Sequence, residues 1–92
     1  MPYIKQYDRA KFKNFLDSFD ALIITQCKGT LSPGEMNFLF TSMILTYLKY
    51  SGINYIQINQ MMGILENVKQ EFYRRVAVPY EENKIKESGD VY

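Results

Sequence analysis

An apolar stripe at helical spacing constrains this chain more than any other feature. Its members lie three or four positions apart, which places them on one face of an α-helix and not on alternating faces of a strand. Asn54 is predicted to cap this helix, with Gln57 at its third position. Gly63 lies inside it, either because a neighbouring helix approaches closely or because a gap there lines a ligand site. The stripe consists of Ile58, Met61, Met62, Leu65, Val68, Phe72 and Val76.

Pro79 marks the place where this helix is expected to bend or stop. Proline has no backbone N–H to donate, and in an α-helix its ring would clash with the carbonyl of Arg75, four residues earlier. We therefore predict a break between Arg75 and Val78. Pro79 can also open a new helix, so a short fourth helix is expected over residues 80–87. Ile85 is its only aliphatic residue, so this helix should pack thinly.

A second helix has the clearest start in the chain. Ser32 can cap it, Pro33 suits the first helical position, and Glu35 can reach back to the cap. The helix is predicted to run to Tyr50, with Ser51 and Gly52 at its end. It is apolar nearly all round, so it should be buried on more than one side. It then either sits in the middle of the fold or also faces another subunit.

The first helix is expected to begin near Asp8 and to end before Gly29, which can adopt the left-handed conformation after a helix. Its apolar positions again follow the helical period: Phe12, Phe15, Leu16, Phe19, Leu22 and Ile23. The three patterns together predict an all-α fold in one domain, residues 1–92. The expected architecture is a three-helix bundle or a helical hairpin, with the short fourth helix after the Pro79 break.

The composition argues against an enzyme. The chain has no histidine, so its single cysteine, Cys27, has no histidine to activate it as a nucleophile. Asp17 and Asp20 share a helix edge but offer too few oxygens for a hard cation. We therefore expect no catalytic residue, no metal and no cofactor. Without a long apolar run or a signal-peptide pattern, a soluble cytoplasmic protein is expected.

The strongest functional signal is an adjacent arginine pair, Arg74 and Arg75, set between two tyrosines. Guanidinium groups bind phosphates through paired hydrogen bonds, and a tyrosine ring offers a surface on which a base can stack. A neighbouring subunit could add Tyr3 or Tyr92 to such a site. The predicted ligand-binding residues are Lys69, Tyr73, Arg74, Arg75 and Tyr80.

The same arginines also allow a purely structural interpretation. They can pair with nearby acids of their own chain, or with helix-end carbonyls freed at Pro79. The acids in reach are Glu71, Glu81 and Glu82. A second basic group near the N-terminus can contact nucleic-acid phosphates or form a solvated face. It consists of Lys5, Arg9, Lys11 and Lys13.

Several short blocks along the whole chain carry a resemblance to known sequences. They are Met1-Pro2-Tyr3-Ile4-Lys5, Gly34-Glu35-Met36-Asn37-Phe38, Gly63-Ile64-Leu65-Glu66, Glu71-Phe72-Tyr73-Arg74-Arg75, Pro79-Tyr80-Glu81 and Gly89-Asp90-Val91-Tyr92. The chain resembles a family of small, uncharacterised proteins of bacteria, phages and prophages. Its relatives have Leu and Tyr at the positions of Met36 and Phe38, and Asn at that of Ser88. The resemblance implies a mobile-element setting but no activity and no assigned site.

These observations favour a small non-enzymatic binding protein that forms a homo-oligomer through its second helix. In a phage setting the expected role is directed at the host, either sequestering a defence-related nucleotide signal or masking a host protein. The alternatives are a nucleic-acid-binding accessory protein and a purely structural oligomeric assembly protein. A net charge of +1 lacks the global basic field of a dedicated duplex-DNA binder, which makes nucleic acid the weaker choice.

Overall fold

A computed structural model describes residues 4–92 of the chain. Within these residues the regular structure is helical and includes no strand, so the predicted all-α class is confirmed. The described residues divide into an N-terminal unit that ends at Ile53 and a C-terminal unit, Asn54–Tyr92. Each unit is described by itself, and the single domain over residues 1–92 stays a prediction.

The N-terminal unit begins with an interrupted helix. The elements are α1 (Gln6–Arg9), a 3₁₀ turn η1 (Ala10–Phe12) and α2 (Lys13–Gln26). The predicted start at Asp8 is wrong, because Asp8 already lies in the first turn and its N–H donates to the Lys5 carbonyl at 2.9 Å. Lys5 occupies the cap position without a side-chain hydrogen bond, so this helix start lacks the stabilisation that a capping side chain provides.

The second helix, α3 (Pro33–Ser51), starts as its sequence predicts. The Ser32 hydroxyl accepts a hydrogen bond from the Glu35 N–H at 3.1 Å, and the Glu35 carboxylate accepts one from the Ser32 N–H at 2.8 Å. The expected turn residues are also confirmed. Gly29 between α2 and α3 and Gly52 after α3 have φ of +88° and +87°, a region that side chains disfavour.

A hollow lined by side chains from α2 and α3 lies within the N-terminal unit. It is mostly apolar, and its lining residues are Phe15, Phe19, Leu39, Ser42, Met43, Thr46 and Tyr47. The two helices therefore turn apolar faces toward the same space. They do not close over it, since Phe15 keeps 56% of its surface exposed and Met43 51%.

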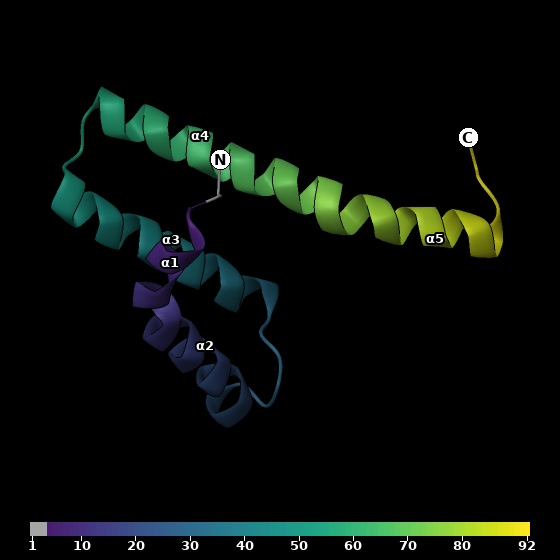
Figure 1. The fold of residues 1–92 in the computed structure, drawn as a ribbon, viewed down its shortest axis with the longest axis horizontal. Helices are drawn as coiled ribbons and strands as arrows, with labels where there is room; N and C mark the ends of the chain where they lie inside the picture. Colours follow the sequence, from purple (N-terminus) through teal and green to yellow (C-terminus); the bar gives the residue numbers. More distant parts are fainter. Residues whose placement is uncertain (1–3) are drawn as a thin grey trace. The chain divides into compact units, whose positions relative to one another are not determined.

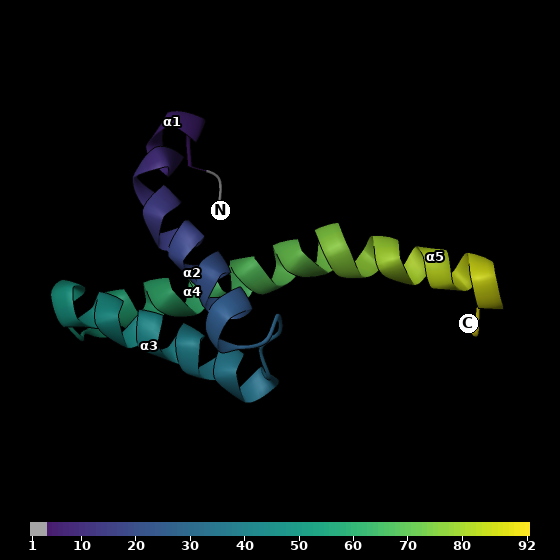
Figure 2. The ribbon, with the colours of Figure 1, turned by 90° about the horizontal axis from the view of Figure 1, so that it is seen from below.

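The C-terminal unit is one continuous helical run, drawn from teal-green to yellow in Figures 1 and 2. It consists of α4 (Tyr55–Phe72), a π-helical segment η2 (Tyr73–Ala77) and α5 (Val78–Ser88). The predicted cap is confirmed, because the Asn54 side chain accepts a hydrogen bond from the Gln57 N–H at 3.0 Å.

The predicted stop at Pro79 is wrong, because the helix passes through this position, and the alternative, a bend, stays a prediction. The N–H of Val78 donates to the carbonyl of Tyr73, five residues earlier, which is the bond of a π-helix. An α-helical turn would press the proline ring against the Arg75 carbonyl, and the wider π turn relieves this clash. The predicted separate fourth helix is therefore a continuation, α5, of the helix that starts at Tyr55.

Exposed apolar surface dominates both units. No side chain of residues 4–92 is buried, so a compact bundle is not seen in the single chain. None of the residues of α3 is buried in the single chain, and Phe38 is 61% exposed, so the predicted position of this helix in the middle of a bundle is not seen. The alternative, a contact with another subunit, stays a prediction. None of the helices in the described residues is long and apolar enough to cross a membrane.

Candidate functional site

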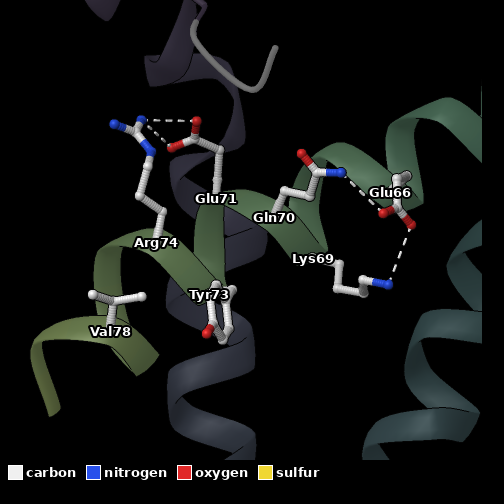
Figure 3. A pocket seen from close by; sticks show the side chains of 7 residues that line it. All are labelled: Glu66, Lys69, Gln70, Glu71, Tyr73, Arg74 and Val78. Atoms are coloured by element: carbon white, nitrogen blue, oxygen red, sulfur yellow. Dashed lines mark hydrogen bonds and ion pairs between the residues drawn. The ribbon is translucent and has the colours of Figure 1, made fainter. Parts of the chain in front are cut away.

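A shallow hollow lies along the C-terminal unit where α4 passes into η2 (Figure 3). Residues three or four apart on a helix share a face, which gathers these side chains from consecutive turns. Of the five predicted ligand residues, Lys69, Tyr73 and Arg74 line the hollow, whereas Arg75 and Tyr80 are not among its lining residues. The full lining is Glu66, Lys69, Gln70, Glu71, Tyr73, Arg74 and Val78.

Glu71 binds both arginines of the pair. Its two carboxylate oxygens accept hydrogen bonds from Arg74 Nη2 at 2.9 and 3.0 Å (Figure 3). The same carboxylate forms an ion pair with Arg75, whose Nε lies 3.6 Å from Oε2. The Glu71 side chain is only 23% exposed, while those of Arg74 and Arg75 are 63% and 62% exposed. The acid is therefore less exposed than the two guanidinium groups with which it pairs.

Lys69 is held in a similar way by Glu66. Its Nζ lies 3.5 Å from Glu66 Oε2, and the Gln70 amide donates to Glu66 Oε1 at 3.0 Å (Figure 3). The hydrogen bond from Gln70, and after it the charge of Lys69, lower the pKa of the Glu66 carboxyl below its ordinary value of 4.5. Glu66 is therefore held as a carboxylate beside the lysine at neutral pH.

The predicted aromatic members of the site are spread along the chain. Tyr73 lines the hollow, but Tyr80 lies on α5 with Lys84 Nζ 5.4 Å from its ring centroid, a cation–π contact. Tyr92 lies beyond α5, where its N–H donates to the Asp90 side chain at 2.9 Å. Tyr3 lies outside the described residues. The structure thus brings only one of these tyrosines to the hollow.

The charges of the hollow balance. Glu66 and Glu71 oppose Lys69 and Arg74, so the lining residues carry no net formal charge. A phosphate would have to compete with carboxylates that already bind the cations. Exposed ion pairs of this kind contribute about 0–1 kcal/mol each, so they hold side chains in place more than they stabilise the fold.

The sequence reasoning missed Glu66 and Gln70 altogether. Their signal was present, because Glu66 precedes Lys69 by three residues and Gln70 by four, the spacings at which helical side chains meet. Glu71 was one of three acids proposed for the arginines. Its distances of three and four residues from Arg74 and Arg75 could have singled it out.

The second basic group is also engaged within its own unit. Arg9 Nε donates to the Ile4 carbonyl at 3.0 Å, and Lys13 pairs with Asp17 one turn later. The other two lysines lie 5.8 and 5.4 Å from the ring centroids of nearby aromatic residues. These contacts favour a solvated helix face, although exposed side chains of this kind can exchange partners at little cost.

Comparison with known proteins gives a family and no activity. No curated protein and no solved structure matches the chain, so neither comparison supplies a relative with a known role. A family model described as a domain of unknown function matches residues 1–91, nearly the whole sequence. It covers the interrupted first helix, α3 and the long helix with its π turn alike. The chain therefore belongs to the family of the domain of unknown function DUF6899.

Proposed function

We propose that this chain is a non-enzymatic assembly protein that acts as a homo-oligomer. In this proposal, helices of different copies complete the bundle that a single chain does not form. The observation that carries it is the absence of any buried side chain in residues 4–92, although 47% of the sequence is hydrophobic.

Folding requires the burial of apolar side chains. Fixing a chain in one conformation costs about 1–2 kcal/mol per residue in backbone entropy, and removal of apolar surface from water is the main favourable term that offsets it. A chain of 92 residues is close to the size at which one core is barely sufficient. A chain that buries no side chain by itself gains this term when copies associate.

We propose α3 as a main contact between copies. Phe38 and Leu45 are seven residues apart, so they lie on one face of α3, two turns from each other. They are 61% and 60% exposed, and no residue of this helix is buried. Aromatic and aliphatic side chains exposed on one face have a lower free energy when they pack against another helix than when they contact water.

Sedimentation velocity of the full chain at about 1–100 μM tests the proposal, since obligate assemblies persist across such a range. Leu45→Lys should reduce the sedimentation coefficient. Asn37→Lys, the same new charge at a polar position of α3, should leave it unchanged. A monomer that keeps full helicity across the range would refute the assembly function.

Binding of a nucleotide at the hollow of the C-terminal unit is the second candidate. It is favoured by the placement of Lys69, Tyr73 and Arg74 around one hollow, and it would suit the host-directed role that the resemblance implies. It ranks second because Glu66 and Glu71 already pair with the cations there. Calorimetry against cyclic and linear nucleotides is the test. Heat that Tyr73→Ala abolishes would support it, and no heat across the panel would exclude it.

Nucleic-acid binding ranks third, because each residue of the N-terminal basic group has a neighbour within its own unit. It requires an affinity that falls steeply with salt. A gel shift that persists unchanged in Arg74→Ala and Arg75→Ala would remove the arginine pair from any such role.

A further inference from the structure

The apolar stripe of α4 changes its spacing at the π turn. From Ile58 to Phe72 the alternating steps are three, four, three and four residues, through Met61, Leu65 and Val68. This is the 3.5-residue repeat of a helix–helix seam. Continued without change, it would place Arg75 and Pro79 in the stripe, an arginine and a proline in an apolar seam.

Two apolar residues, Val76 and Tyr80, each lie one position later than this repeat predicts. The π turn of η2 lies just where the extra residue occurs, between Phe72 and Val76. A π turn closes a bond over five residues where an α turn closes it over four, so it takes up one additional residue. Val76 and Tyr80 thereby stay in line with Phe72, and the arginines flank the stripe instead of interrupting it.

We propose that this stripe, from Leu65 through the π turn to Tyr80, pairs with the same stripe of a second copy of the chain. The inference rests on the proposed homo-oligomer and names one of its seams. Its residues are exposed within the chain, from 41% at Leu65 to 62% at Tyr80, with Phe72 at 61% and Val76 at 51%. The π turn then keeps the apolar residues on both sides of it on one face of the helix, so that the seam continues past Pro79.

A second copy fits this seam for reasons of charge and shape. Five acidic and five basic residues lie between Asn54 and Ser88, so two copies of the helix do not repel each other by net charge. A stripe with a 3.5-residue repeat is complementary to another stripe with that repeat, and a second copy always supplies one.

A pair of matched substitutions tests the seam. Val76→Lys places a charge in it, whereas Ile85→Lys places the same charge on α5, about 140° around the helix from Tyr80. Ile85 is 44% exposed and Val76 51%, so the two sites are comparable in the single chain. We expect Val76→Lys to weaken self-association at least about tenfold, as loss of a buried valine would. Ile85→Lys should change it by less than about twofold.

Sedimentation equilibrium of both variants and the wild-type chain separates the outcomes. A wild-type chain that is monomeric would refute both the proposed assembly function and the proposed seam. A wild-type oligomer that Leu45→Lys dissociates but Val76→Lys does not would overturn the seam and leave the assembly function standing. Equal effects of Val76→Lys and Ile85→Lys would also overturn it.

Disulfide trapping gives a second measurement that does not depend on a destabilised variant. In a Cys27→Ser background, single cysteines at Val68, Phe72, Val76 or Tyr80 are oxidised alone and in pairwise mixtures. Either a parallel or an antiparallel seam brings at least one of these combinations close enough for a disulfide. Crosslinked dimers above the level of Ile85→Cys are expected, and their absence in every mixture would contradict the proposal.

Discussion

Replacing Pro79 by alanine has opposite expected effects on the stability of the helix and on the stability of the proposed seam. The substitution would supply an N–H for the Arg75 carbonyl, and a hydrogen bond of this kind contributes about 0.5–1.5 kcal/mol. Alanine also favours a helix interior over proline by up to about 3 kcal/mol. Part of the cost of proline is already absent, because the π turn relieves the clash. Proline also lowers the conformational entropy of the unfolded chain, which favours the folded state by about 0.4–1 kcal/mol. For the helix alone we expect a gain of about 1–2 kcal/mol.

The seam should lose more than the helix gains. Once the turn becomes α-helical, Val76 and Tyr80 move out of line with Phe72. Complete burial of one large apolar side chain contributes about 1.5–3 kcal/mol. Because Val76 and Tyr80 are 51% and 62% exposed in the chain, association can add about half of that amount for each, or about 1.5–3 kcal/mol together. Pro79→Ala should therefore lower the free energy of unfolding of the oligomer by about 1 kcal/mol per chain, although it favours the helix.

Deleting Arg75 in the Pro79→Ala background provides the rescue. The deletion removes the extra residue, so an uninterrupted α-helix returns Val76 and Tyr80 to the stripe. The deletion also removes the exposed ion pair between Arg75 and Glu71, which contributes at most about 1 kcal/mol to stability. Chemical denaturation followed by circular dichroism at a fixed chain concentration should show the double variant more stable than Pro79→Ala by about 1–3 kcal/mol per chain. A double variant no more stable than Pro79→Ala would refute the register argument.

Three further predictions concern the long helix. Gly63→Ala should stabilise it by about 1 kcal/mol, measured as a higher melting temperature, because an added Cβ meets nothing within 4 Å; a lower melting temperature would reveal close packing between copies. The lowered pKa of Glu66 makes its contribution to stability complete above pH 4.5 and lost as the pH falls through the lowered value, so Glu66→Gln should flatten the stability profile below pH 4.5. Glu71→Gln should reduce stability by about 0.5–1 kcal/mol in low salt and less in high salt, and an unchanged melting temperature would count against the shared carboxylate.

Local signals in the sequence predicted the helix boundaries well. The capping box of Ser32 and Glu35 and the cap at Asn54 depend on residues three apart, so these contacts require only the first turn of the helix. The start of the first helix was predicted less well, because Asp8 suits a cap but also suits the first turn of a helix, where the positive end of the dipole favours an acid.

The course of the chain at Pro79 could not be predicted from the proline alone. A missing N–H and a ring clash both oppose an α-helix, but they do not decide between a break and a wider turn. The apolar spacing carried part of the missing information, since the step of four from Phe72 to Val76 directly follows another step of four, from Val68 to Phe72, and so departs from the alternation of three and four. Burial of α3 could not be predicted for the single chain either, because an apolar surface requires a partner without specifying which chain supplies it.

The π turn also explains why the arginine pair and the proline occur so close together. A turn with one extra residue is less regular than an α turn, and it is a place where a long helix can bend. Glu71 lies just before this turn, and Arg74 and Arg75 lie within it, so the shared carboxylate connects the end of α4 to η2 across the weak point. The same connection would hold both guanidinium groups beside the stripe and keep them from crossing it. If the proposed seam forms, the arginines, the acid and the proline would serve one requirement, a continuous apolar stripe past residue 79, and a ligand would have to compete with Glu71 for the arginines.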